Sequence, residues 1–211
     1  MKDPAFAKFL VLINSAAPAA LLGWDAYSNQ LGPDPINSAE HTTGKLTLIF
    51  LLLTLSITPA RKLTGWNGFS HFRRMLGLFA YFYAGLHFSI YFTFDKSFSV
   101  AGVIWDTFHK PFIFIGMLAL LALTPLALTS TNGAIKRLGA VKWKQLHRLV
   151  YEASIAGVIH FYLTVKRDVR QPLAFAAVLA VLLGYRIVAG FVKKKPPAAR
   201  AASTIAKTTD G

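Results

Sequence analysis

The sequence predicts an all-α fold, an integral membrane bundle of six transmembrane helices. Hydrophobic residues make up 54% of the 211-residue chain, and the mean hydropathy is +0.46. Charged residues account for only 15%, below the ~25% of an ordinary soluble domain. The apolar residues also gather in six runs, each near the ~20 residues that a helix needs to cross the hydrocarbon core of a bilayer.

The six predicted spans are separated by connections rich in glycine, proline and polar residues. The spans cover Phe6–Gly23, Thr42–Ala60, Met75–Phe94, Pro111–Thr129, Leu146–Val165 and Pro172–Val192. Pro111 and Pro172 lie near the starts of the fourth and sixth spans, where a missing N–H is tolerated. Thr58-Pro59 is expected to end the second span. This span fits the membrane if the Lys45 side chain extends to the interface.

The first span has an alternative interpretation as a signal peptide. Lys2 and Lys8 precede or begin an apolar stretch that small residues follow, which is the order of features in such peptides. We favour a retained span, because the distribution of positive charge depends on it. Pro18 within this span predicts a kink.

Lysine and arginine are unevenly distributed between the two sides of the predicted bundle. With the N-terminus inside, 17 of the 23 lysines and arginines lie on the inner side, which predicts that both termini are cytoplasmic. The net charge of +14 comes from short clusters beside apolar runs. This placement favours contact with anionic lipid over nucleic acid binding. The outer side carries the acidic residues Asp25, Asp34, Glu40, Asp95, Asp106 and Asp168.

The chain is predicted to form one membrane domain over residues 1–195, followed by a disordered cytoplasmic tail over residues 196–211. The tail is rich in alanine, threonine and proline, a composition typical of disorder. The chain has no cysteine, which excludes disulfides and iron–sulfur clusters. It also has no GxGxxG motif, so any partner that uses NAD(P)H must be another polypeptide.

Two histidines lie deep inside predicted spans, where an ionisable residue is costly and indicates a functional site. His87 is 13 residues beyond Arg74, and His160 is 13 residues beyond His147. At ~1.5 Å per residue both lie about 19 Å along helices that run outward. His87 and His160 are therefore expected at the same depth, where two imidazoles could bind one haem iron from opposite faces. The alternative is that each histidine only makes a hydrogen bond between helices.

The glycines near these histidines in sequence, Gly85 and Gly157, are expected to make room for a flat macrocycle.

The other histidines are weaker candidates. His147 lies near the inner surface, about 140° around its helix from His160, so it can bind iron only at a second, inner haem. His71 is the nearest partner for it, but lies in a predicted connection. His41 and His109 are expected at the outer ends of spans, where His41 could pass a proton to a quinone. A solvated role is the alternative for both, and zinc is disfavoured because no HExxH or similar ligand set occurs.

An ordered set of motifs resembles a known family. GPDP, HTTGK, ITPAR, RRMLGL, GLHFSIY, LALTSTNG, WKQLHRLVY and IHFY follow one another from about Gly32 to Val165. In this order they resemble the MsrQ (YedZ) family, the haem-binding membrane subunits of the periplasmic methionine sulfoxide reductase system. The resemblance implies a ferric reductase-like transmembrane domain. It also implies haem b, one or two, held by His87, His147 and His160, with flavin mononucleotide (FMN) as an associated cofactor. Related domains carry two histidines on the third span, and this chain shows one.

The implied role is an electron-transfer subunit of an oxidoreductase system in the bacterial inner membrane. Members of the family take electrons from the quinone pool or from a flavin reductase. They pass them to MsrP, a periplasmic molybdoenzyme that repairs methionine sulfoxide in proteins. The acidic outer connections would meet that acceptor. Two alternatives remain: a ferric or superoxide-generating transmembrane reductase, and a haem-free transporter or scaffold.

Overall fold

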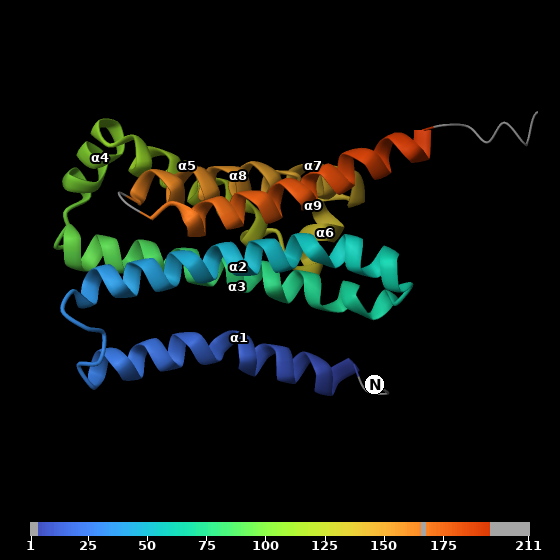
Figure 1. Cartoon of the computed structure of the whole chain (residues 1–211). Helices are drawn as coiled ribbons and strands as arrows, with labels where there is room; N and C mark the ends of the chain where they lie inside the picture. The colour runs from blue at the N-terminus through green and yellow to red at the C-terminus, as the bar shows by residue number, and fades with distance from the viewer. Residues whose placement is uncertain (1–3, 166–167, 195–211) are drawn as a thin grey trace, which may run out of the picture.

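The computed structural model describes residues 4–165 and 168–194, which form a bundle of long, roughly aligned helices (Figure 1). The long helices are α1 (Pro4–Tyr27), α2 (Pro35–Thr64), α3 (Ser70–Ile90), α5 (Pro111–Leu128), α8 (Leu149–Thr164) and α9 (Arg170–Lys194). The shorter elements are η1 (Asn67–Phe69), η2 (Tyr91–Asp95), α4 (Val100–His109), α6 (Asn132–Leu138) and α7 (Ala140–Leu146). The expected disordered tail at residues 196–211 lies outside the described residues.

The predicted all-α membrane fold is confirmed. Within the described residues, five helices are long and apolar enough to cross a membrane: α1, α2, α3 with its η2 extension, α5 and α9. The remaining predicted span, the fifth (Leu146–Val165), corresponds to α8, which has only 16 residues. The chain is therefore a multi-pass membrane protein.

The bundle is built from two tightly packed helix pairs. Helix α2 packs along α3, and α5 packs along α8, while α9 lies against α2 and α8. The core between them contains fully buried aliphatic and small residues such as Leu51, Leu55, Ala80 and Ala153. The alanines among them let neighbouring helix backbones approach closely, as small residues do where helices associate in a membrane.

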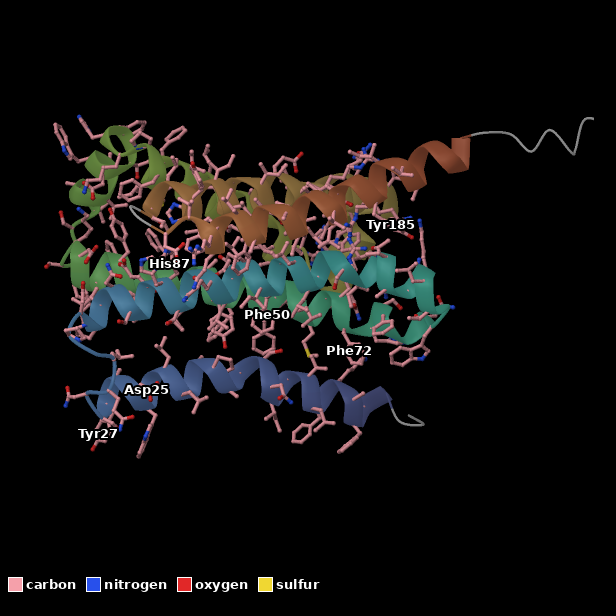
Figure 2. All side chains as sticks on the ribbon, in the orientation of Figure 1. Asp25, Tyr27, Phe50, Phe72, His87 and Tyr185 are labelled. Carbon is pink, nitrogen blue, oxygen red and sulfur yellow. The ribbon has the colours of Figure 1, made fainter. Side chains whose placement is uncertain are left out.

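Helix α1 lies at the edge of the bundle and packs mainly on α3 (Figure 1). Its attachment is centred on Tyr83, which is fully buried and stacks on Phe50 with ring centroids 5.3 Å apart. Figure 2 shows Phe50 on the side of α2 that faces α1. The Tyr83 hydroxyl donates to the carbonyl of Ser15 (2.7 Å) and accepts from the N–H of Ala19 (3.2 Å). It therefore joins two backbone groups on either side of Pro18, where the proline interrupts the helical hydrogen bonds.

Helix α2 is longer than the sequence predicted at both ends. It begins at Pro35, because Asp34 caps it by accepting from the N–H of Asn37 (3.2 Å) and Pro35 occupies its first position. It continues through Pro59 and ends at Gly65, whose φ of 70° is the left-handed conformation that glycine favours at a helix end. The prediction that Thr58-Pro59 ends the span was wrong. His41 consequently lies inside a helix, two turns from its start.

Candidate functional site

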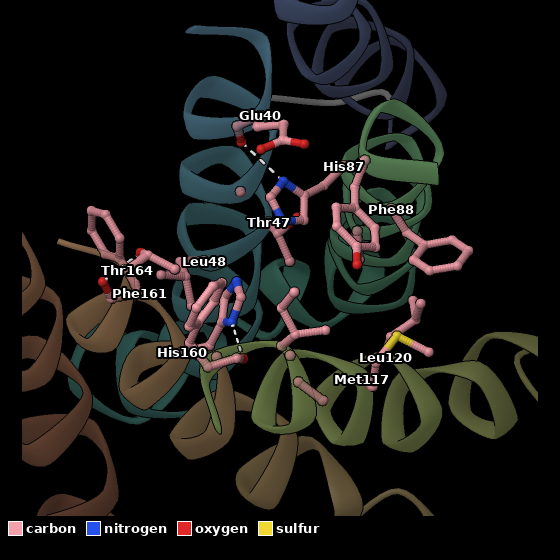
Figure 3. Close-up of a pocket in the computed structure, with 18 of the residues that line it drawn as sticks. Glu40, Thr47, Leu48, His87, Phe88, Met117, Leu120, His160, Phe161 and Thr164 are labelled. Atoms are coloured by element: carbon pink, nitrogen blue, oxygen red, sulfur yellow. Dashed lines mark hydrogen bonds between the residues drawn. The ribbon is translucent and has the colours of Figure 1, made fainter. Parts of the chain in front are cut away.

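A cavity of about 390 Å³ lies among α2, α3, α5 and α8, within the size range of small-molecule and cofactor sites. Residues of η2 and α4, together with Lys96 and Lys110, line the end of the cavity beside α4. His87 from α3 and His160 from α8 both line the cavity (Figure 3). The structure therefore brings together the two histidines for which the sequence predicted a common depth.

The two imidazole rings are 6.0 Å apart between centroids and nearly perpendicular, at 79°. An imidazole nitrogen lies about 2 Å from a bound transition metal and about 1 Å from its own ring centre, so two imidazoles on opposite sides of one ion have ring centres roughly 6 Å apart. The observed separation fits a single metal ion between the two rings.

Each ring is oriented by a hydrogen bond to the backbone of a neighbouring helix. Nδ1 of His87 donates to the carbonyl of Glu40 on α2 (2.9 Å), and Nδ1 of His160 donates to the carbonyl of Phe112 on α5 (2.7 Å). A carbonyl can only accept, so the proton is on Nδ1 and the lone pair is on Nε2. Figure 3 shows these bonds holding the rings from opposite sides of the cavity. This is the arrangement that fixes histidine ligands of a metal.

The helix that accepts each hydrogen bond carries a glycine one turn beyond the acceptor carbonyl. The acceptor carbonyl is followed four residues later by a glycine, Gly44 after Glu40 and Gly116 after Phe112. A Cβ at Gly44 would lie 3.4 Å from the His87 ring, and a Cβ at Gly116 would lie 2.8 Å from Nδ1 of His160. The missing side chains let each ring approach its carbonyl. Gly85 does not line the cavity, and a Cβ there would meet nothing within 4 Å, so its expected role in making room for a macrocycle stays a prediction. Gly157 does line the cavity, where its nearest neighbour is Leu48.

A buried ion-pair network lines the end of the cavity beside α4. Asp106 on α4 is 4% exposed. It accepts hydrogen bonds from the Tyr91 hydroxyl (2.9 Å) and from Lys110 (3.0 Å), and it pairs with Lys96. The hydrogen bond from Lys96, assisted by Lys110, lowers the pKa of Asp106 from 3.8 to about 2. This carboxylate therefore stays ionised and binds η2 and the following segment to α4.

The acidic residues expected on the outer surface are thus partly enclosed. Asp106 is buried in its network, and Glu40 is half-buried and lines the cavity. The sequence placed both in outer connections, whereas in the structure Glu40 lies in the second turn of α2 and Asp106 on α4, and both line the cavity. The polar start of α2 and the presence of α4 were not expected from hydropathy alone.

The remaining histidines lie apart from this pair. His147 follows α7, stacks on Trp143 with centroids 3.8 Å apart, and does not line the cavity. His41 does line the cavity, with its ring 6.5 Å from that of Phe161. His71 is exposed in the first turn of α3. His109 is exposed and stacks on Trp105, with ring centroids 3.6 Å apart.

The donor set fits iron held by a macrocycle better than a bare ion. Over residues 4–165 and 168–194, no group of three or more histidine, cysteine, aspartate or glutamate side chains is placed to hold a metal ion. A haem would bring four nitrogen donors of its own and would need only the imidazoles of His87 and His160 from the chain. The described residues therefore match the ligand requirement of a haem.

The fold and the histidine pair define a transmembrane domain of the ferric reductase type. The protein family described as "Ferric reductase like transmembrane component" matches residues 43–158, which include α3, α5 and most of α8. The chain is also similar over most of its length to a set of more specific relatives, all bearing the name "protein-methionine-sulfoxide reductase heme-binding subunit MsrQ".

Three of these relatives illustrate the similarity. The protein of Herminiimonas arsenicoxydans is 41% identical over 95% of this chain and 93% of its own length. That of Xanthomonas euvesicatoria is 45% identical over 86% of this chain and 85% of its own. That of Deinococcus radiodurans is 44% identical over 89% of both. The chain belongs to the MsrQ family. No solved structure matches it.

Proposed function

We propose that the chain is a haem b electron-transfer subunit of a methionine sulfoxide reductase system. The observation that carries the proposal is the pair His87 and His160, with ring centroids 6.0 Å apart and their Nδ1 atoms occupied by backbone carbonyls. The relatives are named as heme-binding subunits of such a reductase. A haem bound between these two rings supplies a one-electron ferric/ferrous couple.

The residues of the chain set the conditions for that couple. The carbonyls of Glu40 and Phe112 hold the two imidazoles as neutral rings with Nε2 free, and each bond makes its ring a more basic ligand. Apolar side chains such as Leu48, Leu51 and Leu123 line the middle of the cavity and exclude water. Low polarity around a ligated iron disfavours the more highly charged oxidation state.

We include His147 in the proposal as the ligand of a second, inner haem. Its Nδ1 donates to the carbonyl of Trp143 (3.1 Å). Among the described residues its buried Nε2 makes no hydrogen bond of good geometry, although the carbonyl of Leu126 lies beside the ring. Nε2 is the nitrogen that would bind iron, as in His87 and His160. FMN, implied by the family resemblance, has no residues assigned to it here.

The proposed path runs outward across the bacterial inner membrane, with both termini in the cytoplasm. The quinone pool or a cytosolic flavin reductase donates electrons, and a periplasmic molybdoenzyme of the MsrP type accepts them. The basic inner connections support this orientation, because 17 of 23 lysines and arginines lie on that side.

The first test is the absorbance of single-histidine variants purified from cells with ample haem. His87→Ala and His160→Ala are expected to lose the Soret band of the shared haem, whereas His147→Ala should lose only part of the total haem. His109→Ala is the matched control, since this histidine is exposed and away from the cavity. Unchanged spectra in both His87→Ala and His160→Ala would contradict the ligand assignment. A colourless wild-type protein would favour a haem-free transporter or scaffold.

The ferric reductase-like match favours one rival function, direct reduction of ferric iron or oxygen. Stopped-flow reoxidation of the dithionite-reduced protein separates the two functions. We expect rapid reoxidation by purified MsrP, and slower reoxidation by chelated ferric iron in the absence of oxygen. The reverse order would support the rival.

A further inference from the structure

Lys45 lines the cavity, whereas the sequence analysis expected its side chain to extend to the membrane interface. It is the eleventh residue of α2, about 15 Å from the helix start at ~1.5 Å per residue. It follows Gly44, where an added Cβ would lie 3.4 Å from the His87 ring. Lys45 is half-buried and lines the same cavity as His87 and His160. Its ammonium group therefore belongs to the environment of the cavity.

Three lysines line this cavity, and they differ in their partners. Lys96 and Lys110 both pair with Asp106 at the outer end. Among the residues that the structure describes, Lys45 has no ion pair and no side-chain hydrogen bond. Glu40 is the nearest acid on α2, but a spacing of five residues places it about 140° around the helix. A half-buried lysine without an ion pair, lining a largely apolar cavity, indicates a functional site.

The partner must be an anion that enters the cavity. A b-type haem carries two propionate carboxylates on an otherwise apolar macrocycle, so this occupant brings both the apolar surface and the negative charge. His41 lies four residues before Lys45 on the same face of α2 and also lines the cavity. This helix face therefore offers a cation and a second hydrogen-bond donor beside the two imidazoles.

We propose that Lys45 binds a propionate carboxylate of the tetrapyrrole in this cavity, with His41 as a neighbouring donor on the same helix face. The inference rests on the proposed function, since it assumes a haem between His87 and His160. It assigns to α2 a binding role in addition to supplying the carbonyl that orients His87. No covalent step is involved.

The test compares haem with haem dimethyl ester, in which both carboxylates are blocked. Full-length protein from haem-depleted cells is titrated with each porphyrin in detergent, and the ratio of the two dissociation constants is measured at the Soret band. Using this ratio cancels differences in porphyrin partitioning and in overall stability. A charge-assisted hydrogen bond to a propionate should make the dissociation constant of haem roughly tenfold or more lower than that of the dimethyl ester. The wild-type protein and Lys45→Arg should show this preference, and Lys45→Met should lose it.

Two further variants sharpen the result. Lys45→Gln keeps a donor without charge and should retain a small preference, which checks that loss in Lys45→Met does not come from misfolding. Lys136→Met removes an exposed lysine away from the cavity and should keep the wild-type ratio. An unchanged ratio in Lys45→Met, or an equal loss in Lys136→Met, would overturn the inference while leaving the haem proposal standing. Binding of neither porphyrin by the wild-type protein would overturn both.

The holoprotein provides an independent measurement. Excess apomyoglobin should remove haem from Lys45→Met faster than from wild type, by a factor similar to the lost preference. Equal rates of haem transfer from both proteins would count against a carboxylate contact at this residue.

Discussion

Replacing Gly116 by alanine tests the role of His160 without altering any titratable group. Gly116 is one helical turn after Phe112, whose carbonyl accepts the hydrogen bond from His160 (2.7 Å). An added Cβ would lie 2.8 Å from Nδ1 and 2.9 Å from Cε1 of the ring. Carbon atoms pack at about 3.5 Å or more, so the ring must move by roughly 0.7 Å. The movement takes Nδ1 away from its acceptor.

The expected cost follows from these contacts. Weakening the Nδ1 hydrogen bond costs about 0.5–1.5 kcal/mol, and a side-chain rotation of ~30° out of its energy minimum costs a similar amount. Loss of a hydrogen bond that orients a metal ligand typically weakens metal binding by ~10- to 100-fold. We therefore expect Gly116→Ala to bind haem about 10- to 100-fold more weakly than wild type. Alanine favours the helix over glycine by ~1 kcal/mol, so a destabilised α5 would not explain the loss.

Haem per polypeptide, Soret position and the electron paramagnetic resonance of the oxidised protein measure this effect. Gly44→Ala is the graded comparison, because its Cβ would lie 3.4 Å from the His87 ring and should disturb binding only slightly. Gly184→Ala, with nothing within 4 Å, is the neutral control. Wild-type haem content and spectra in Gly116→Ala would refute the argument that this glycine admits the His160 ring to its carbonyl.

Three further predictions concern stability in detergent, measured by thermal unfolding. Tyr83→Phe removes the two hydrogen bonds that hold α1 and leaves buried backbone groups unpaired. It should lower the free energy of unfolding by about 1–3 kcal/mol without shifting the haem spectrum. Full stability of this variant would show that packing alone holds α1. The pKa of Asp106 is lowered from 3.8 to about 2 by Lys96 and Lys110. Its contribution to stability should therefore be constant above pH 4 and decline between pH 4 and pH 2, so the advantage of wild type over Asp106→Asn should shrink in that window; a pH-independent difference would contradict this. Arg186 on α9 donates to the carbonyl of Leu55 on α2 and lies over the Tyr151 ring on α8. Arg186→Lys cannot reproduce both contacts and should lower stability by about 1–2 kcal/mol, whereas an unchanged melting temperature would mean that the arginine is not holding these helices together.

The helical membrane fold could be predicted because long apolar runs admit few other structures. The extent of α2 could not be predicted from hydropathy, since its first turns are polar. The sequence nevertheless carries a signal for the start of α2, because Asp34 is a capping residue and Pro35 follows it at the first helical position. Helix α4 was missed for a different reason: its 10 residues are largely apolar but too short for a membrane span. Its start is marked by Ser99, which caps it by accepting from the N–H of Gly102 (3.0 Å).

The common depth of His87 and His160 could be predicted because their helices run in the same direction. Each histidine lies 13 residues beyond a residue at the inner end of its span. The surroundings of the pair depend on which helices become neighbours, and one sequence does not specify that. Gly44 and Gly116 contact rings that lie 43 and 44 residues further along the chain. Asp106 similarly meets Tyr91 and Lys96 only because α4 folds back over the cavity.

The carbonyls that orient the two imidazoles also constrain the order of events during biogenesis. His87 is oriented by α2, which is synthesised before it, and His160 is oriented by α5, which is also already made. When α5 leaves the ribosome, one oriented imidazole and both acceptor carbonyls are present, but the second imidazole is still missing. On the proposed assignment, haem binding by both histidines would wait for α8, and nascent chains arrested before that helix should bind haem weakly or not at all.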